Sequence, residues 1–148
     1  MAAQTGTDHI ARATTTIAAP ADKVWRALTD PATIKQYMFG AAVQSDWKVG
    51  SPITWKGDMK GKPYEDKGKI QKVESGKVLE YTHYSPMSGE PDTPESYHVV
   101  TVKLSPDGNG TRVDLEQTKN PTDDARKHSE ENWNQMLVGM KKVVEGAK

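Results

Sequence analysis

Residues 123–145 read DDARKHSEENWNQMLVGMKKVVE, and this stretch decides the fold of the chain. Its apolar residues recur at intervals of three and four, which predicts a helix with one apolar stripe. The stripe consists of Trp133, Met136, Leu137, Met140, Val143 and Val144. At 1.5 Å per residue such a helix is roughly 35 Å long, enough to cross a small domain. It therefore needs an apolar surface of similar length to cover it.

Both ends of this helix carry residues that helix ends prefer. Thr122 can cap the first turn, and Asp123-Asp124 complement the positive end of the helix dipole. Lys141-Lys142 are expected in the last turn, where positive charge is favoured, and Gly146 is expected just beyond the helix as its C′ residue.

The residues before this helix favour antiparallel strands. β-branched and aromatic residues alternate with polar ones, and Gly, Asn and Pro mark the turns, including a hairpin loop at 57–62. Strands are expected at residues 9–17, 42–46, 51–56, 64–73, 77–84, 97–105 and 111–118. One face of such a sheet is apolar, and the last helix is the segment that can cover it.

Two short helices are expected between the first strand and the others. Pro20 suits the first helical position of one, and Asp30 can cap the other with Pro31 at its first position. The chain is thus an α+β protein with one domain, residues 9–148, after a flexible tail at residues 1–8. A long loop is expected at residues 85–96, which contain three prolines.

Composition excludes several classes of function. Twenty basic residues balance twenty acidic ones, so no net charge attracts nucleic acid or an anionic membrane. The lysines between positions 56 and 77 alternate with acidic residues and are typical of a solvated strand face. The absence of Cys removes disulfides and thiol catalysis. No apolar run is long enough for a membrane span, no signal peptide is evident, and we expect a cytoplasmic protein.

No catalytic or metal-binding motif is present. The four histidines, at positions 9, 83, 98 and 128, lack the spacing of a local metal site. No Gly-x-Ser-x-Gly nucleophile motif occurs, and residues 57–62 lack the spacing of a phosphate-binding loop. We therefore predict no catalytic residue, no metal and no cofactor.

His98 is the most informative polar residue. It alternates in phase with Val100 and Val102, which predicts that its side chain points to the covered face of the sheet. One interpretation is a histidine at a cavity mouth, bonded to a backbone group or water. The other is a group that orients a ligand or acts as a general base. His83, in a row with Leu79 and Tyr81, has the same two interpretations.

Several stretches, taken in order, resemble the START-like or SRPBCC superfamily, which has the helix-grip fold. They are residues 17–31 (IAAPADKVWRALTDP), 68–70 (GKI) with 78–82 (VLEYT), 110–113 (GTRV), and 132–133 (NW) with Leu137. Within the superfamily, the chain looks like the branch named after activators of the ninety-kilodalton heat-shock protein's ATPase. The resemblance covers about residues 9 to 145. It implies a curved antiparallel sheet of six to seven strands wrapped around the long helix.

The resemblance also implies a cavity between sheet and helix that takes an apolar or aromatic small molecule. The candidate lining residues are Trp55, Tyr81, His83, His98, Val100, Trp133, Met136, Leu137 and Met140. Two alternatives remain open. One is a co-chaperone that acts through its surface, although no feature of the sequence supports a chaperone partner. The other is an enzyme similar to polyketide cyclases and hydratases, with Tyr81, His83 and His98 as its polar groups.

Overall fold

The computed structural model describes residues 9–38, 40–59, 61–85, 91–93, 96–120 and 122–146. The expected tail at residues 1–8 and much of the expected loop at 85–96 lie outside this part of the chain. The elements are β1 (His9–Ile17), α1 (Ala21–Thr29), α2 (Pro31–Tyr37), β2 (Ala42–Ser45), β3 (Pro52–Met59), β4 (Lys62–Glu74), β5 (Val78–His83), β6 (His98–Asp107), β7 (Gly110–Asn120) and α3 (Asp123–Gly146).

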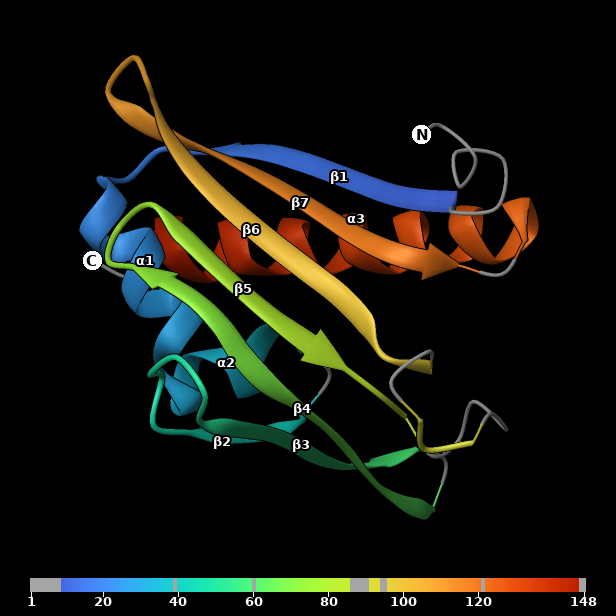
Figure 1. Ribbon diagram of the computed structural model, residues 1–148. Helices are drawn as coiled ribbons and strands as arrows, with labels where there is room; N and C mark the ends of the chain where they lie inside the picture. The colour runs from blue at the N-terminus through green and yellow to red at the C-terminus, as the bar shows by residue number, and fades with distance from the viewer. Residues whose placement is uncertain are drawn as a thin grey trace.

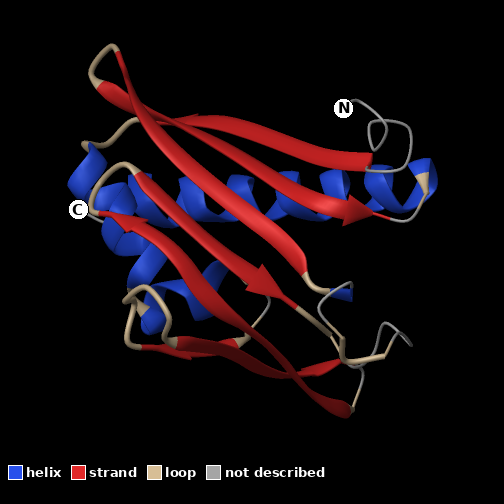
Figure 2. Ribbon diagram, in the orientation of Figure 1, coloured by secondary structure: helices blue, strands red, loops and turns tan. Residues whose placement is uncertain are grey.

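The strands form one antiparallel sheet in the order β1-β7-β6-β5-β4-β3-β2. Figure 1 shows α3 lying along one face of the curved sheet, behind β7 and β6 and below β1 in this view. The helices α1 and α2 lie on the same face, so the molecule has a strand layer and a helix layer (Figure 2). The expected helix-grip arrangement is confirmed.

The apolar stripe of α3 packs on the inward rows of the sheet, as predicted. Met136, Leu137, Met140 and Val144 are buried, and Trp133 packs against the core while remaining half-buried. The sheet contributes the inward residues Val100, Val102, Leu104, Val113 and Leu115. Because full burial of a large apolar side chain stabilises by roughly 1.5–3 kcal/mol, this contact is a main source of the fold's stability.

Charged side chains of α3 also cover the outer edge of β1. Edge strands have unpaired backbone groups that can recruit other chains. Three of these groups bond to α3: the N–H of Arg12 to Glu130 (3.0 Å), the carbonyl of Thr16 to Lys141 (2.7 Å) and, just after β1, the N–H of Ala18 to Glu145 (2.8 Å). The helix therefore both covers the core and protects one edge of the sheet.

Two expectations about helix ends were wrong. Gly146 is the last residue of α3, so the last turn contains no basic residue. Pro20 is the N-cap of α1, which begins at Ala21; its ring fixes φ at −69° while ψ stays extended at 160°, so the helix starts one residue later. The expected caps at Asp30 and Thr122 are confirmed, because each side chain accepts a backbone N–H three residues ahead.

The expected hairpin loop at 57–62 was also too long. Residues 57–59 continue β3, and Lys62 already pairs with Met59 at the start of β4. Gly57 lies opposite Tyr64, and an added Cβ at Gly57 would lie only 2.5 Å from the Tyr64 hydroxyl. The glycine is therefore part of the ladder, where it makes room for the tyrosine ring.

Candidate functional site

A small internal void lies between α2, the sheet and α3. Its volume is about 30 Å³, enough for about one or two water molecules. Large apolar and aromatic side chains surround it, including Tyr37 and Met38 at the end of α2, Trp47 after β2, and Trp55 on β3. In this conformation the interior is thus a nearly filled core.

The nine predicted cavity residues fall into three groups. Trp55, Tyr81 and Met136 line the void. Three others are fully buried core residues: Val100, Leu137 and Met140. The remaining three, His83, His98 and Trp133, are only partly buried. The prediction that these residues bind a ligand stays a prediction, but the fold does place them all on its covered side.

Aromatic rings connect the void to the partly buried histidines. The ring of Trp55 is tilted against that of Tyr81, with the centroids 5.3 Å apart. It meets the ring of His83 edge-on, with the centroids 5.0 Å apart. The rings of His83 and His98 are 6.3 Å apart. Because Trp55 belongs to both the void and this row, one continuous aromatic surface leads from the core to its rim.

His83 contacts the carboxylate of Asp66. This pair was not predicted from the sequence. The Nε2 atom of His83 lies 2.9 Å from the Asp66 Oδ2 atom. Asp66 pairs with Trp55 across β3 and β4, so both side chains face the covered side. The missed signal was strand alternation, since Asp66 precedes the buried Ile70 by four residues and shares its inward phase.

The second oxygen of Asp66 is the most unusual atom of the site. Among the side chains that the structure describes, Asp66 Oδ1 is the buried polar atom without a hydrogen-bond partner. Buried polar atoms are nearly always bonded, and an exception requires an explanation.

His98 is held by the backbone. Its Nδ1 atom donates to the carbonyl of Thr118 at 2.8 Å. A bond to a backbone group is what the first interpretation of His98, a histidine at a cavity mouth, predicts. The bond fixes the orientation of the ring at the rim of the interior.

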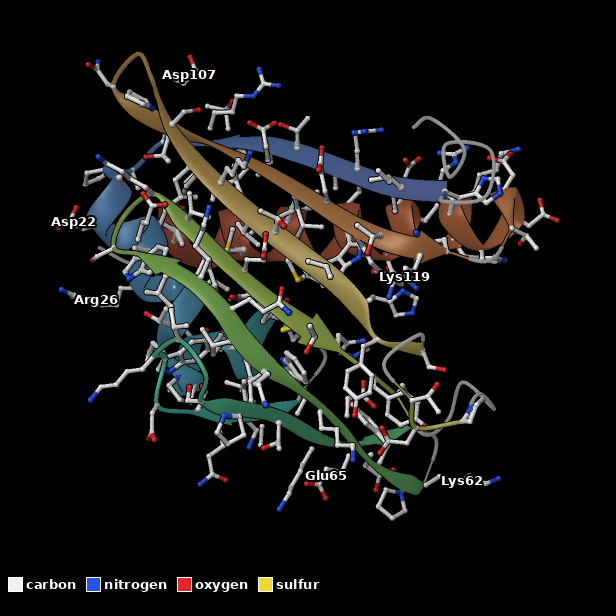
Figure 3. The ribbon with its side chains drawn as sticks, viewed as in Figure 1. Asp22, Arg26, Lys62, Glu65, Asp107 and Lys119 are labelled. Atoms are coloured by element: carbon white, nitrogen blue, oxygen red, sulfur yellow. The ribbon has the colours of Figure 1, made fainter. Side chains whose placement is uncertain are left out.

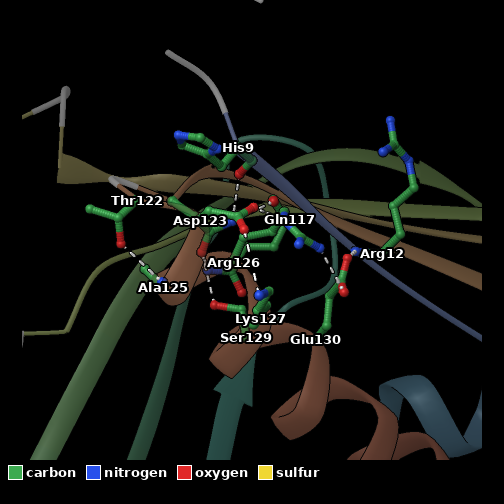
Figure 4. Close-up of polar contacts among 11 residues, drawn as sticks. His9, Arg12, Gln117, Thr122, Asp123, Ala125, Arg126, Lys127, Ser129 and Glu130 are labelled. Carbon is green, nitrogen blue, oxygen red and sulfur yellow. Dashed lines mark hydrogen bonds and ion pairs between the residues drawn. The ribbon is translucent and has the colours of Figure 1, made fainter. Parts of the chain in front are cut away.

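A hydrogen-bonded network anchors the first half of α3 to the end of β7 (Figure 4). The buried Asn120 side chain donates to the carbonyls of His9 (2.8 Å) and Gln117 (3.1 Å) and accepts from Ser129 (2.8 Å). Trp133 donates its indole N–H to the Gln117 side chain. This bond ties the Trp133 ring to the end of β7.

Two buried tyrosines contribute neutral hydroxyl groups. Burial raises the pKa of both Tyr37 and Tyr81 far above the usual value of a phenol. The hydroxyl of Tyr37 donates to the carbonyl of Ala27 at 2.7 Å, which fastens α2 to α1.

Neither a metal centre nor a membrane span is found in the described part of the chain. No group of three or more His, Cys, Asp or Glu side chains there could hold a metal ion. None of its helices has both the length and the apolar character needed to cross a bilayer.

Comparison with known proteins identifies the family. The model of the family described as "Activator of Hsp90 ATPase homolog 1-like protein" matches residues 18–145. The chain belongs to this family. No curated protein matches it.

Several solved structures are similar to this chain. A protein from Cytophaga hutchinsonii, solved in solution, is 53% identical, with 93% of this chain and 94% of that chain covered and a TM-score of 0.81. The Aha1 dimer from Colwellia psychrerythraea is 22% identical, with 94% and 98% covered and a TM-score of 0.73. Ara h 8.0201 is 12% identical, with 94% and 99% covered and a TM-score of 0.74. The last two likenesses show the fold alone.

Proposed function

We propose that the chain binds an apolar or aromatic small molecule between the sheet and α3. The supporting observation is the void between α2, β3 and α3, which is lined by aromatic and methionine side chains. Ligand pockets are typically concave and mostly apolar, with a few polar groups at defined places. The row from Trp55 to His83 and His98 supplies such polar groups at one side of the void.

Ligand binding requires the void to widen. Its 30 Å³ is well below the roughly 150 Å³ of an engineered cavity that takes benzene. Met136 and Met38 both line the void, and methionine adapts its shape more readily than branched or aromatic residues. We therefore place the ligand where these two side chains now lie, with Trp55 and Tyr81 as fixed walls.

Substitution of Met136 tests this placement. Titration with a fluorescent aromatic probe should give tighter binding to Met136→Ala, because the substitution enlarges the void, and weaker binding to Met136→Trp. The matched control is Met140→Ala, which removes the same side chain one turn further along α3, outside the void lining. Melting curves show which variants are folded. Equal affinity in all folded variants, or the same gain in Met140→Ala, would contradict the placement.

The family supplies a second candidate function. Its description names activation of the Hsp90 ATPase, and the match to residues 18–145 favours testing that activity here. The assay is ATP hydrolysis by purified Hsp90 with and without this chain. Stimulation that is unchanged in Met136→Trp would support a surface-mediated activity that is independent of the void.

A further inference from the structure

We infer that Asp66 and His83 form the recognition site for a hydrogen-bond donor on the ligand, so that the chain selects phenol-like aromatic molecules over hydrocarbons. This inference rests on the proposed binding function and adds the chemical class of the ligand. It assigns a role to Asp66.

The pair offers acceptors where a ligand would meet it. A carboxylate can only accept hydrogen bonds, so His83 donates from Nε2 to Asp66 Oδ2 across 2.9 Å. In the neutral ring, Nδ1 is then an acceptor. Asp66 Oδ1 is buried and has no partner among the described residues. A ligand hydroxyl or N–H group would supply the missing donor.

In the described part of the chain, no Lys or Arg side chain pairs with this carboxylate. The partner of Asp66 among the described residues is His83. The neighbouring Lys67 instead pairs with Asp92 at 2.5 Å, on the outer face of the sheet. A buried carboxylate oxygen that lacks both a donor and a cation is costly, and a ligand that brings a donor relieves that cost.

The pair lies at the rim, next to the void. The side chains of Asp66 and His83 are 16% and 29% exposed, so a molecule entering from solvent reaches them before the core. Trp55 contacts the His83 ring edge-on, with centroids 5.0 Å apart, and also lines the void. A ring held against Trp55 can therefore place a hydroxyl substituent near Asp66.

The test compares 2-naphthol with 2-methoxynaphthalene, which keeps the ring system but lacks the donor. Wild type should bind 2-naphthol on the order of tenfold more tightly, as expected for a hydrogen bond to a charged group. Asp66→Asn keeps the shape but can present an N–H₂ group to the ligand, so the preference should disappear. The matched control is Glu65→Gln, the same chemical change at an exposed residue of β4 (Figure 3).

The possible outcomes separate the two proposals. If wild type binds both probes equally, the donor site is wrong while the binding function stands. If neither probe binds, the proposed function itself fails and the donor site falls with it. Loss of the preference in Glu65→Gln to the same extent as in Asp66→Asn would show a general charge effect and would also overturn the inference.

Discussion

The two halves of α3 differ in their main contacts with the sheet, while Lys141 and Glu145 of the second half also bond to the backbone of Thr16 and Ala18. From Met136 to Val144, buried apolar side chains pack against the inward rows of the strands. Before Trp133, the contacts with β1 and β7 are mainly hydrogen bonds, as Figure 4 shows. Both halves belong to one continuous helix (Figure 1).

The two kinds of contact have different consequences for α3: apolar contacts can repack, whereas hydrogen bonds fix the position of the helix. Apolar contacts are non-directional, so the second half can repack around a change in volume, and the small void lies beside it. Hydrogen bonds require defined distances and angles. The first half therefore fixes the position of α3 along the sheet. Its main anchor is Asn120 at the end of β7, which follows Lys119, a residue with a left-handed φ of +60°.

Met140→Ala should have the largest effect on stability. Met140 is fully buried in the apolar half, and its truncation should lower the free energy of unfolding by about 3 kcal/mol. Urea unfolding measures this change as a lower midpoint with an unchanged slope. A loss below about 1 kcal/mol would mean that the apolar half is packed more loosely than its burial indicates.

Asn120→Ala should have the next largest effect. It removes the side chain that bonds to His9, Gln117 and Ser129 and should cost about 2 kcal/mol, because buried partners lose their bonds. Ser129→Ala removes one of these contacts and should cost less. If both variants lose the same amount, Asn120 is not the centre of the network.

Trp133→Phe should have a smaller effect. It deletes the indole N–H that bonds to the Gln117 side chain while keeping an aromatic ring, and should cost about 1 kcal/mol. Hydrogen exchange of the first turns of α3 should rise more than exchange near Met140, because the tether to β7 is released. A uniform rise along the helix would contradict the division into two halves.

The smallest effect concerns pH and the β1 edge. A backbone N–H from Arg12 lowers the pKa of Glu130, and one from Ala18 lowers the pKa of Glu145. Because the folded pKa lies below the usual 4.5, this stabilisation is present above about pH 4.5 and is lost as pH falls through the folded pKa. Urea midpoints at about pH 6 and pH 3 should therefore differ less in the Glu130→Gln/Glu145→Gln variant than in wild type. An identical pH dependence would show that these contacts contribute nothing in solution.

The sequence by itself determined the elements and their order. The spacing of Met136, Leu137 and Met140 predicts α3 because a helix repeats every 3.6 residues, and the alternation of Val100 and Val102 predicts a half-covered strand. These patterns are local and need no knowledge of neighbours. The faces of both elements, and thus the covered side of the sheet, follow from them.

Only the tertiary structure decided the details of the candidate site. Asp66 meets His83 because β4 and β5 pair in one particular register, and residues 17 positions apart in the chain carry no local signal of that contact. The volume of the void depends on how all its lining side chains fill a shared space, which no single residue reveals. The same holds for Asn120, whose partners come from β1, β7 and α3, because a hydrogen-bond network exists only once the elements that supply it are in place.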